Sequence, residues 1–232
     1  MSGSQRSRTF EIDRTLSLLT ASLEEAHFGP LRKTQLEALA GFLGELGGFH
    51  HLLRLVSELN PEDIALHLLE SLSVGSKLRP GAQTLDIGPG GGFPGIPMGI
   101  LRADVRIVLL ERRQRVAAYL DHVVQALGLK HVRVSCLEFE KALATGSLAC
   151  IQEITAKAVW SWQEYLRKVL PLLQENARAW VFGTPSLTKE SVGEFLQGAY
   201  EGDMLVSSFD IRLAGGSPER RIFSVSLGSF QT

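Results

Sequence analysis

A glycine-rich turn near the middle of the chain has the composition of a ligand-binding loop. It reads Leu85-Asp86-Ile87-Gly88-Pro89-Gly90-Gly91-Gly92-Phe93-Pro94-Gly95. Glycine lets the backbone take positive φ angles and approach a ligand closely, and proline suits the first turn of a helix. The unpaired amides of a helix start favour negative charge or acceptor oxygens. The segment predicts a strand, a turn and a helix, with a nucleotide-like ligand against the main chain of the turn.

Two ligand-binding patterns overlap in this turn. Asp86, Gly88, Gly90 and Gly92 form D-x-G-x-G-x-G, the pattern of S-adenosylmethionine (AdoMet)-dependent methyltransferases. A frame shifted by two residues gives the dinucleotide pattern G-x-G-x-x-G. That pattern should begin directly after the strand and open a long helix, but residues 86–89 intervene and prolines stand where the helix should start. The methyltransferase pattern fits better, and a glycine turn without a ligand is the alternative.

Further candidate ligands follow the ends of the next two predicted strands. Glu111 ends the second strand, where an acid in doubly wound folds hydrogen-bonds ribose hydroxyls. The alternative for Glu111 is an ion pair with Arg112 or Arg113. Leu137 and Glu138 follow the third strand, where the chain passes the adenine in such folds. Their alternative is an exposed loop.

Lys157 follows the fourth predicted strand, between two alanines that are too small to shield it. A cation at this place would contact the methionine carboxylate of AdoMet or an RNA phosphate, and a solvated surface lysine is the alternative. Asp86 is expected to organise the turn or to hold the amino group of the cofactor rather than to act as a general base. The sequence contains no nucleophile elbow, P-loop lysine or metal-ligand spacing, so no catalytic residue is assigned and no metal is expected.

A parallel sheet is needed to bring these residues together. Strands and helices alternate from residue 83, which is typical of such a sheet. Strands are expected at 83–87, 106–111, 131–136, 149–155 and 178–183, and helices at 94–102, 113–127, 160–173 and 187–199. A final hairpin is expected at 204–212 and 220–227.

The first 75 residues have the apolar spacing of helices. Gly47-Gly48 is expected to break the second helix, and Asn60-Pro61-Glu62-Asp63 is a strong helix start. We therefore expect an N-terminal helical cap, residues 1–75, and an α/β domain, residues 76–232.

The composition limits the cellular location and the binding partners that we expect for the protein. Of its 232 residues 44% are hydrophobic, yet no apolar run approaches the roughly 20 residues that cross a bilayer. The polar N-terminus lacks a signal-peptide core, so we expect a cytoplasmic protein without a membrane partner. A net charge of −1 means that RNA would need a local basic patch. Arg112, Arg113 and Lys157 are predicted to form it, in preference to Lys130 and Arg133.

Several stretches together resemble one bacterial family. The glycine turn ends in Pro94-Gly95-Ile96-Pro97, an ending much rarer than the glycines, and His67–Leu72, Arg115–Leu129 and Ser135–Glu138 support it. Over roughly residues 45–185 the chain resembles the small-subunit ribosomal RNA guanine-N7 methyltransferases, historically called glucose-inhibited division protein B.

The resemblance implies a Rossmann-like methyltransferase fold with a mostly parallel seven-stranded sheet and a helical cap. It also implies AdoMet as the cofactor, with contacts from Gly88, Phe93, Leu137 and Glu138. Two segments depart from the family pattern. Gly48–Leu55 replaces an Asn-rich segment, and Ala156-Lys157-Ala158 replaces Ser-Arg-Ala, which keeps the charge but loses the planar guanidinium fork. The chain is therefore interpreted as a divergent member.

The leading hypothesis is a monomeric methyltransferase that modifies guanine N7 of ribosomal RNA, free or in the small subunit. Guanine N7 offers a lone pair, so the transfer requires placement of the reactants but no general base. The alternative is an AdoMet-binding but inactive relative that acts as a ribosome-binding or assembly module.

Overall fold

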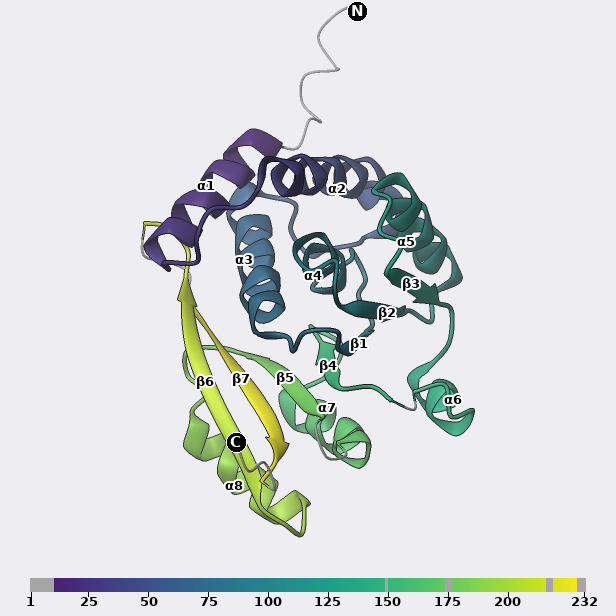
Figure 1. Cartoon of the computed structure of the whole chain (residues 1–232), viewed down its shortest axis with the longest axis vertical. Coiled ribbons are helices and arrows are strands. Elements are labelled where there is room, and N and C mark those ends of the chain that lie inside the picture. Colours follow the sequence, from purple (N-terminus) through teal and green to yellow (C-terminus); the bar gives the residue numbers. More distant parts are fainter. Residues whose placement is uncertain (1–10, 149, 174–176, 216–218, 229–232) are drawn as a thin grey trace, which may run out of the picture.

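A seven-stranded mixed sheet forms the centre of the molecule (Figure 1). The computed structural model describes residues 11–148, 150–173, 177–215 and 219–228. The strand order is β3-β2-β1-β4-β5-β7-β6. The five parallel strands are β1 (Gln83–Ile87), β2 (Arg106–Leu110), β3 (Val132–Ser135), β4 (Glu153–Ala156) and β5 (Arg178–Gly183). The hairpin of β6 (Met204–Arg212) and β7 (Glu219–Leu227) pairs antiparallel with β5. The predicted fold class, a mostly parallel seven-stranded α/β sheet, is confirmed.

Helices cover both faces of the sheet (Figure 1). One face packs against α1 (Ile12–Glu25), α2 (Lys33–Leu53), α3 (Pro61–Lys77), α4 (Gly95–Leu101) and α5 (Gln114–Ala126). The other packs against α6 (Phe139–Ala144), α7 (Trp162–Val169) with the short 3₁₀ turn Leu170–Leu172, and α8 (Lys189–Ala199). Alternating residues of β2 explain this division, because Ile107 and Leu109 enter the first core whereas Val108 and Leu110 enter the second.

The N-terminal helices are continuous with the main core. Leu39 and Phe42 of α2 are fully buried in the same apolar cluster as Ile107 of β2. Helix α3 begins as predicted, because the side chain of Asn60 accepts a hydrogen bond from the amide of Asp63. The boundary at residue 75 stays a prediction, and α3 itself extends to Lys77.

Two expectations about the elements are wrong, and one element was missed. Helix α2 continues through Gly47-Gly48 to Leu53, because buried Leu46 and half-buried Phe49 anchor both sides of the pair. That packing outweighs the roughly 1 kcal/mol that each glycine costs a helix. Strand β4 begins at Glu153 rather than at 149, a residue outside the described part. Helix α6 was not expected.

Some predicted segments fall partly outside the described residues. They are residues 1–10 of the cap and residues 216–218 of the final hairpin turn. Within the described part, no helix has the length and apolar character needed to cross a membrane. The same residues hold no group of His, Cys, Asp and Glu that would bind a metal ion.

Candidate functional site

The glycine turn joins β1 to α4 with backbone angles that favour glycine. Gly88, Gly90 and Gly92 have φ angles of +64°, +53° and +101°. The amide of Gly88 donates a hydrogen bond to the carbonyl of Leu110, which ties the turn to the end of β2. The turn is also packed closely by protein, since a Cβ on Gly88 would lie 2.6 Å from Val159. The glycines therefore serve the packing of the turn as well as any ligand.

Asp86 organises this turn from inside the protein. Its side chain is fully buried, and its Oδ2 accepts a 2.8 Å hydrogen bond from the amide of Gly95. Its Oδ1 accepts a 3.1 Å hydrogen bond from the hydroxyl of Thr155 on β4. Burial raises the pKa of Asp86 to about 7, although these hydrogen bonds oppose the shift. Of the two predicted roles, the geometry supports the organiser of the turn and not a ligand of the cofactor.

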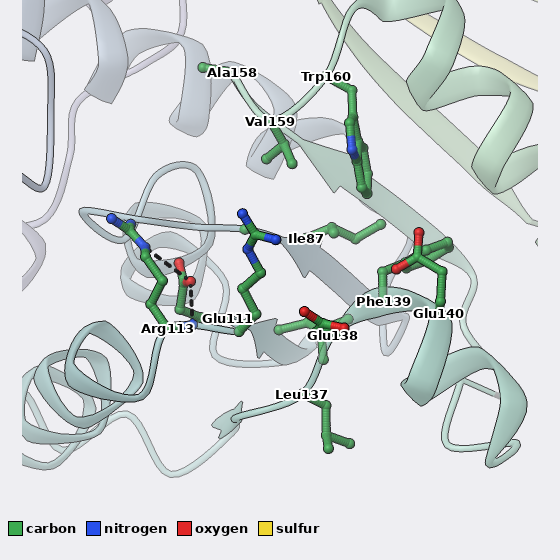
Figure 2. A pocket seen from close by; sticks show the side chains of 13 residues that line it. Ile87, Glu111, Arg113, Leu137, Glu138, Phe139, Glu140, Ala158, Val159 and Trp160 are labelled. Carbon is green, nitrogen blue, oxygen red and sulfur yellow. Dashed lines mark hydrogen bonds and ion pairs between the residues drawn. The ribbon is translucent and has the colours of Figure 1, made fainter.

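A cavity of about 450 Å³ lies where β1, β2 and β3 end (Figure 2). Its volume is within the range of small-molecule sites. Gly88, Glu111, Leu137 and Glu138, all predicted cofactor ligands, line it together. Arg112 and Arg113, predicted to contact RNA, line it too. We call this space the first cavity.

Glu111 provides an acceptor at the edge of the first cavity. The residue is 3% exposed, and its Oε1 accepts hydrogen bonds from the amide and Nε of Arg113, at 2.9 and 3.3 Å. The predicted ion-pair alternative is thus present. It uses one carboxylate oxygen, and the other has no hydrogen-bond partner among the described residues. The structure therefore leaves one oxygen of Glu111 available to a hydroxyl group.

Trp160 was missed by the sequence interpretation. With Val159 it enters the first cavity from the segment after β4, opposite Leu137 (Figure 2). Its ring meets Phe139 edge to face, with centroids 5.8 Å apart. The available signal was its position, because the segment after β4 reaches the same edge of the sheet as Glu111.

A second cleft, of about 700 Å³, lies on the other side of the glycine turn. Gly90 and Phe93 line it, with the segment 54–57 that follows α2. Gly88, Arg113 and Ala158 line both spaces. The residues predicted as one cofactor site are thus divided: Gly90, Phe93 and Lys157 lie in the second cleft, and Asp86 and Gly92 line neither space.

Lys157 is shielded, contrary to expectation. Its side chain is only 12% exposed and forms an ion pair with Glu70 of α3. Its Nζ lies 2.6 Å from Nδ1 of His67 and 5.9 Å from the ring centre of Phe93. The small neighbouring alanines do not expose it, because α3 and Phe93 enclose the side chain.

Lys157 and Glu70 each affect the ionisation of the other. Burial lowers the pKa of Lys157. Burial alone would raise the pKa of Glu70, but the Lys157 ammonium and His67 lower it to about 2. Lys157 therefore already has an internal counter-ion, which a phosphate or carboxylate ligand would have to replace.

The fold is shared with solved methyltransferases. The O-methyltransferase from Bacillus cereus, solved in complex with SAH, superposes with a TM-score of 0.57 at 16% identity, over 91% of this chain and 99% of that one. The METTL16 methyltransferase domain gives a TM-score of 0.55 at 11% identity, over 82% of this chain and 80% of that one. The fold is therefore the Rossmann-like fold of methyltransferases, and the glycine turn has the pattern of the AdoMet-dependent ones.

A family model narrows this class. Residues 34–192, well over half of the chain, match the family described as rRNA small subunit methyltransferase G, or GidB. The chain belongs to this family, which confirms the resemblance seen in the sequence.

Named relatives share only part of their length with the chain. The ribosomal RNA small subunit methyltransferase G of Sorangium cellulosum is 36% identical over 52% of this chain, and the chain spans about half, 52%, of that protein. The protein of the same name from Chromobacterium violaceum is 37% identical over 64% of this chain and 70% of its own length.

Proposed function

We propose that the protein transfers a methyl group from AdoMet to N7 of a guanine in small-subunit ribosomal RNA. The observation that supports this most is the meeting of two spaces at Gly88 and Ala158. A donor in the first cavity and an acceptor in the second cleft would adjoin there. The names of the relatives supply the substrate class, ribosomal RNA of the small subunit.

The residues of the first cavity fit the cofactor. Glu111 has a carboxylate oxygen for a ribose hydroxyl, and Leu137 and Glu138 line the wall where the adenine is expected. Trp160 adds an aromatic surface to the same space. AdoMet supplies an electrophilic methyl group when it is bound. The chain's own residues bind and orient it, and we propose Gly88, Glu111, Leu137 and Glu138 as its ligands.

The second cleft suits the acceptor nucleotide. His50, Arg54 and His67 line it, so donors of hydrogen bonds and positive charge are present. Guanine N7 carries a lone pair and needs no deprotonation, which agrees with the position of Asp86 away from both spaces. The proposed contribution of the protein is proximity and orientation, which lower the barrier by removing the search for a reactive geometry.

Methylation of isolated particles tests this function. Small ribosomal subunits from a strain lacking the protein are incubated with it and labelled AdoMet, and the modified nucleotide is mapped. Label at N7 of one guanine is expected. If the protein binds AdoMet and the subunits but transfers no label, it is instead a binding or assembly module. We further propose a monomeric, cytoplasmic protein with a cap at 1–75 and a methyltransferase domain at 76–232.

A further inference from the structure

A groove lined by basic side chains lies at the opposite ends of the strands from the two ligand spaces. Its volume is about 680 Å³, and its basic lining residues are Arg106, Lys130, His131 and Arg133. No acidic residue of the described chain lines it. We call it the basic groove.

The strand register places two arginines on one face of the sheet. Arg106 begins β2 beside Gln83 of β1, and Arg133 of β3 lies beside Val108 of β2. Residues two apart on a strand, and residues side by side on neighbouring strands, point to the same face. Arg106 and Arg133 therefore share the face of Val108, and both are exposed. Strand β3 is the edge of the sheet, so a large partner can reach this face.

The charge of the basic groove is not compensated within the protein. Asp104 is only two residues from Arg106, but both of its carboxylate oxygens accept 2.8 Å hydrogen bonds from Arg102. Among the described residues, Arg106, Lys130 and Arg133 form no ion pair. Of the cations near the ligand spaces, Arg113 pairs with Glu111 and Lys157 pairs with Glu70. Arg112 and Arg54, which also line those spaces, form no ion pair among the described residues. The sequence preferred Arg112, Arg113 and Lys157 over Lys130 and Arg133, yet two of those three preferred cations are paired within the protein and neither Lys130 nor Arg133 is.

We propose that the basic groove binds phosphate groups of the RNA that carries the methylated nucleotide. This inference rests on the proposed function. Uncompensated lysine and arginine side chains bind RNA by releasing the cations condensed on its phosphates. With a net charge of −1, the protein needs such a local concentration of positive charge to hold a polyanion.

The dimensions of the sheet fit an extended contact. Arg106 and Glu111 are the two ends of one extended segment, which spans about 16 Å at about 3.3 Å per residue. The far end of this segment lies at the first cavity, which adjoins the second cleft at Gly88, Arg113 and Ala158. An RNA with one nucleotide in the second cleft must therefore extend past the first cavity and along the edge strand β3 to reach the basic groove. Charges on an edge strand also prevent it from pairing with the sheet of another molecule. If this were their only role, a variant without the charges would aggregate but would bind RNA with unchanged affinity.

A matched pair of variants tests the basic groove. Arg106→Gln/Lys130→Gln/Arg133→Gln removes its three permanent charges. Lys33→Gln/Lys189→Gln/Arg212→Gln removes the same charge from exposed positions elsewhere. Binding of a fluorescent small-subunit ribosomal RNA transcript is measured by anisotropy over a series of KCl concentrations. AdoMet affinity is measured by calorimetry, and folding by circular dichroism.

The groove variant is expected to bind the transcript at least about tenfold more weakly, with a salt slope reduced by about three. The control variant should change far less, and both should bind AdoMet normally. Equal RNA affinity and slope in the wild type and the groove variant, or equal losses in both variants, would overturn the inference. Wild-type protein that shows no salt-dependent RNA binding would instead overturn the proposed function. Should the triple variant misfold, single changes at exposed Lys130 and Arg133 are each expected to reduce the slope by about one.

Discussion

Glu111 and Glu70 are both almost fully buried, with 3% and 2% of their surface exposed, yet their carboxylates have different partners. Glu111 shares one oxygen with Arg113 and leaves the other without a partner among the described residues. Glu70 is enclosed by the cation of Lys157, by His67 at 3.5 Å and by Arg220 at 3.8 Å. Burial therefore does not distinguish a proposed ligand such as Glu111 from a structural group such as Glu70. The distinction is the bonding capacity that remains after the protein's own contacts are made.

The largest effect is expected from breaking the Glu70–Lys157 pair. Glu70→Ala leaves a buried ammonium without its counter-ion, which should lower the free energy of unfolding by about 3–5 kcal/mol in urea denaturation. The double variant Glu70→Leu/Lys157→Met removes both charges and should recover most of the loss. If Glu70→Ala is as stable as the wild type, the pair does not hold α3 to the segment after β4, and the contrast with Glu111 disappears.

The pH dependence of stability should separate the carboxylate of Asp86 from that of Glu70. The pKa of Asp86 is raised from 3.8 to about 7. The contribution of Asp86 to the stability of the fold is therefore full below pH 3.8 and is lost as the pH rises through 7. The pKa of Glu70 is lowered from 4.5 to about 2, so its contribution is present above pH 4.5 and is lost as the pH falls through 2. The wild type should therefore lose about 2–4 kcal/mol of unfolding free energy between pH 4 and 7, measured by urea denaturation at each pH. Asp86→Asn should not show this loss. An unchanged pH profile in Asp86→Asn would show that Asp86 is ionised in the folded protein.

A smaller effect, on binding rather than stability, is expected at Glu111. Glu111→Ala should weaken AdoMet binding by about 1.5–3 kcal/mol, because a charged hydrogen-bond acceptor is lost. Glu140→Ala is the matched control, since Glu140 also lines the first cavity but is bonded to Lys168. Calorimetric titration of both variants measures the difference. Equal affinities for AdoMet would return Glu111 to the role of an ion-pair partner of Arg113.

The smallest effect is expected at Gly90. The motif alone places this residue against the cofactor, whereas the structure places it in the second cleft. Gly90→Ala should cost about 1–2 kcal/mol of stability, because its φ of +53° is unfavourable for a residue with a side chain. AdoMet affinity should remain close to that of the wild type. A loss of AdoMet affinity without a loss of stability would show that the cofactor crosses the turn into the second cleft.

The sequence predicted the elements and residues whose signals are local. The alternation of strands and helices led to the sheet, and strand ends led to Glu111, Leu137 and Glu138, which the structure brings into one cavity. The family followed from the unusual Pro94–Pro97 ending of the turn, and it is confirmed.

Features that depend on distant partners were missed. Glu70 and Lys157 are far apart in the sequence, so no local pattern shows that one shields the other. The sequence also did not show that the glycine turn borders two separate spaces, because Val159 and Leu55 approach the turn from different parts of the chain. Helix α2 crosses Gly47-Gly48 for the same reason, since tertiary packing outweighs a weak local preference.

The wall shared by the first cavity and the second cleft has a thermodynamic consequence. Gly88, Arg113 and Ala158 line both spaces, so a ligand that repositions any of them in one space changes the binding surface of the other. The affinities of the two ligands are then linked, and the factor by which the first raises or lowers the affinity of the second must equal the reverse factor. Under the proposed function, a methyl donor and its demethylated product would differ in charge next to this wall. Each would then set its own affinity for the RNA, and the exchange of one for the other would direct release of the substrate.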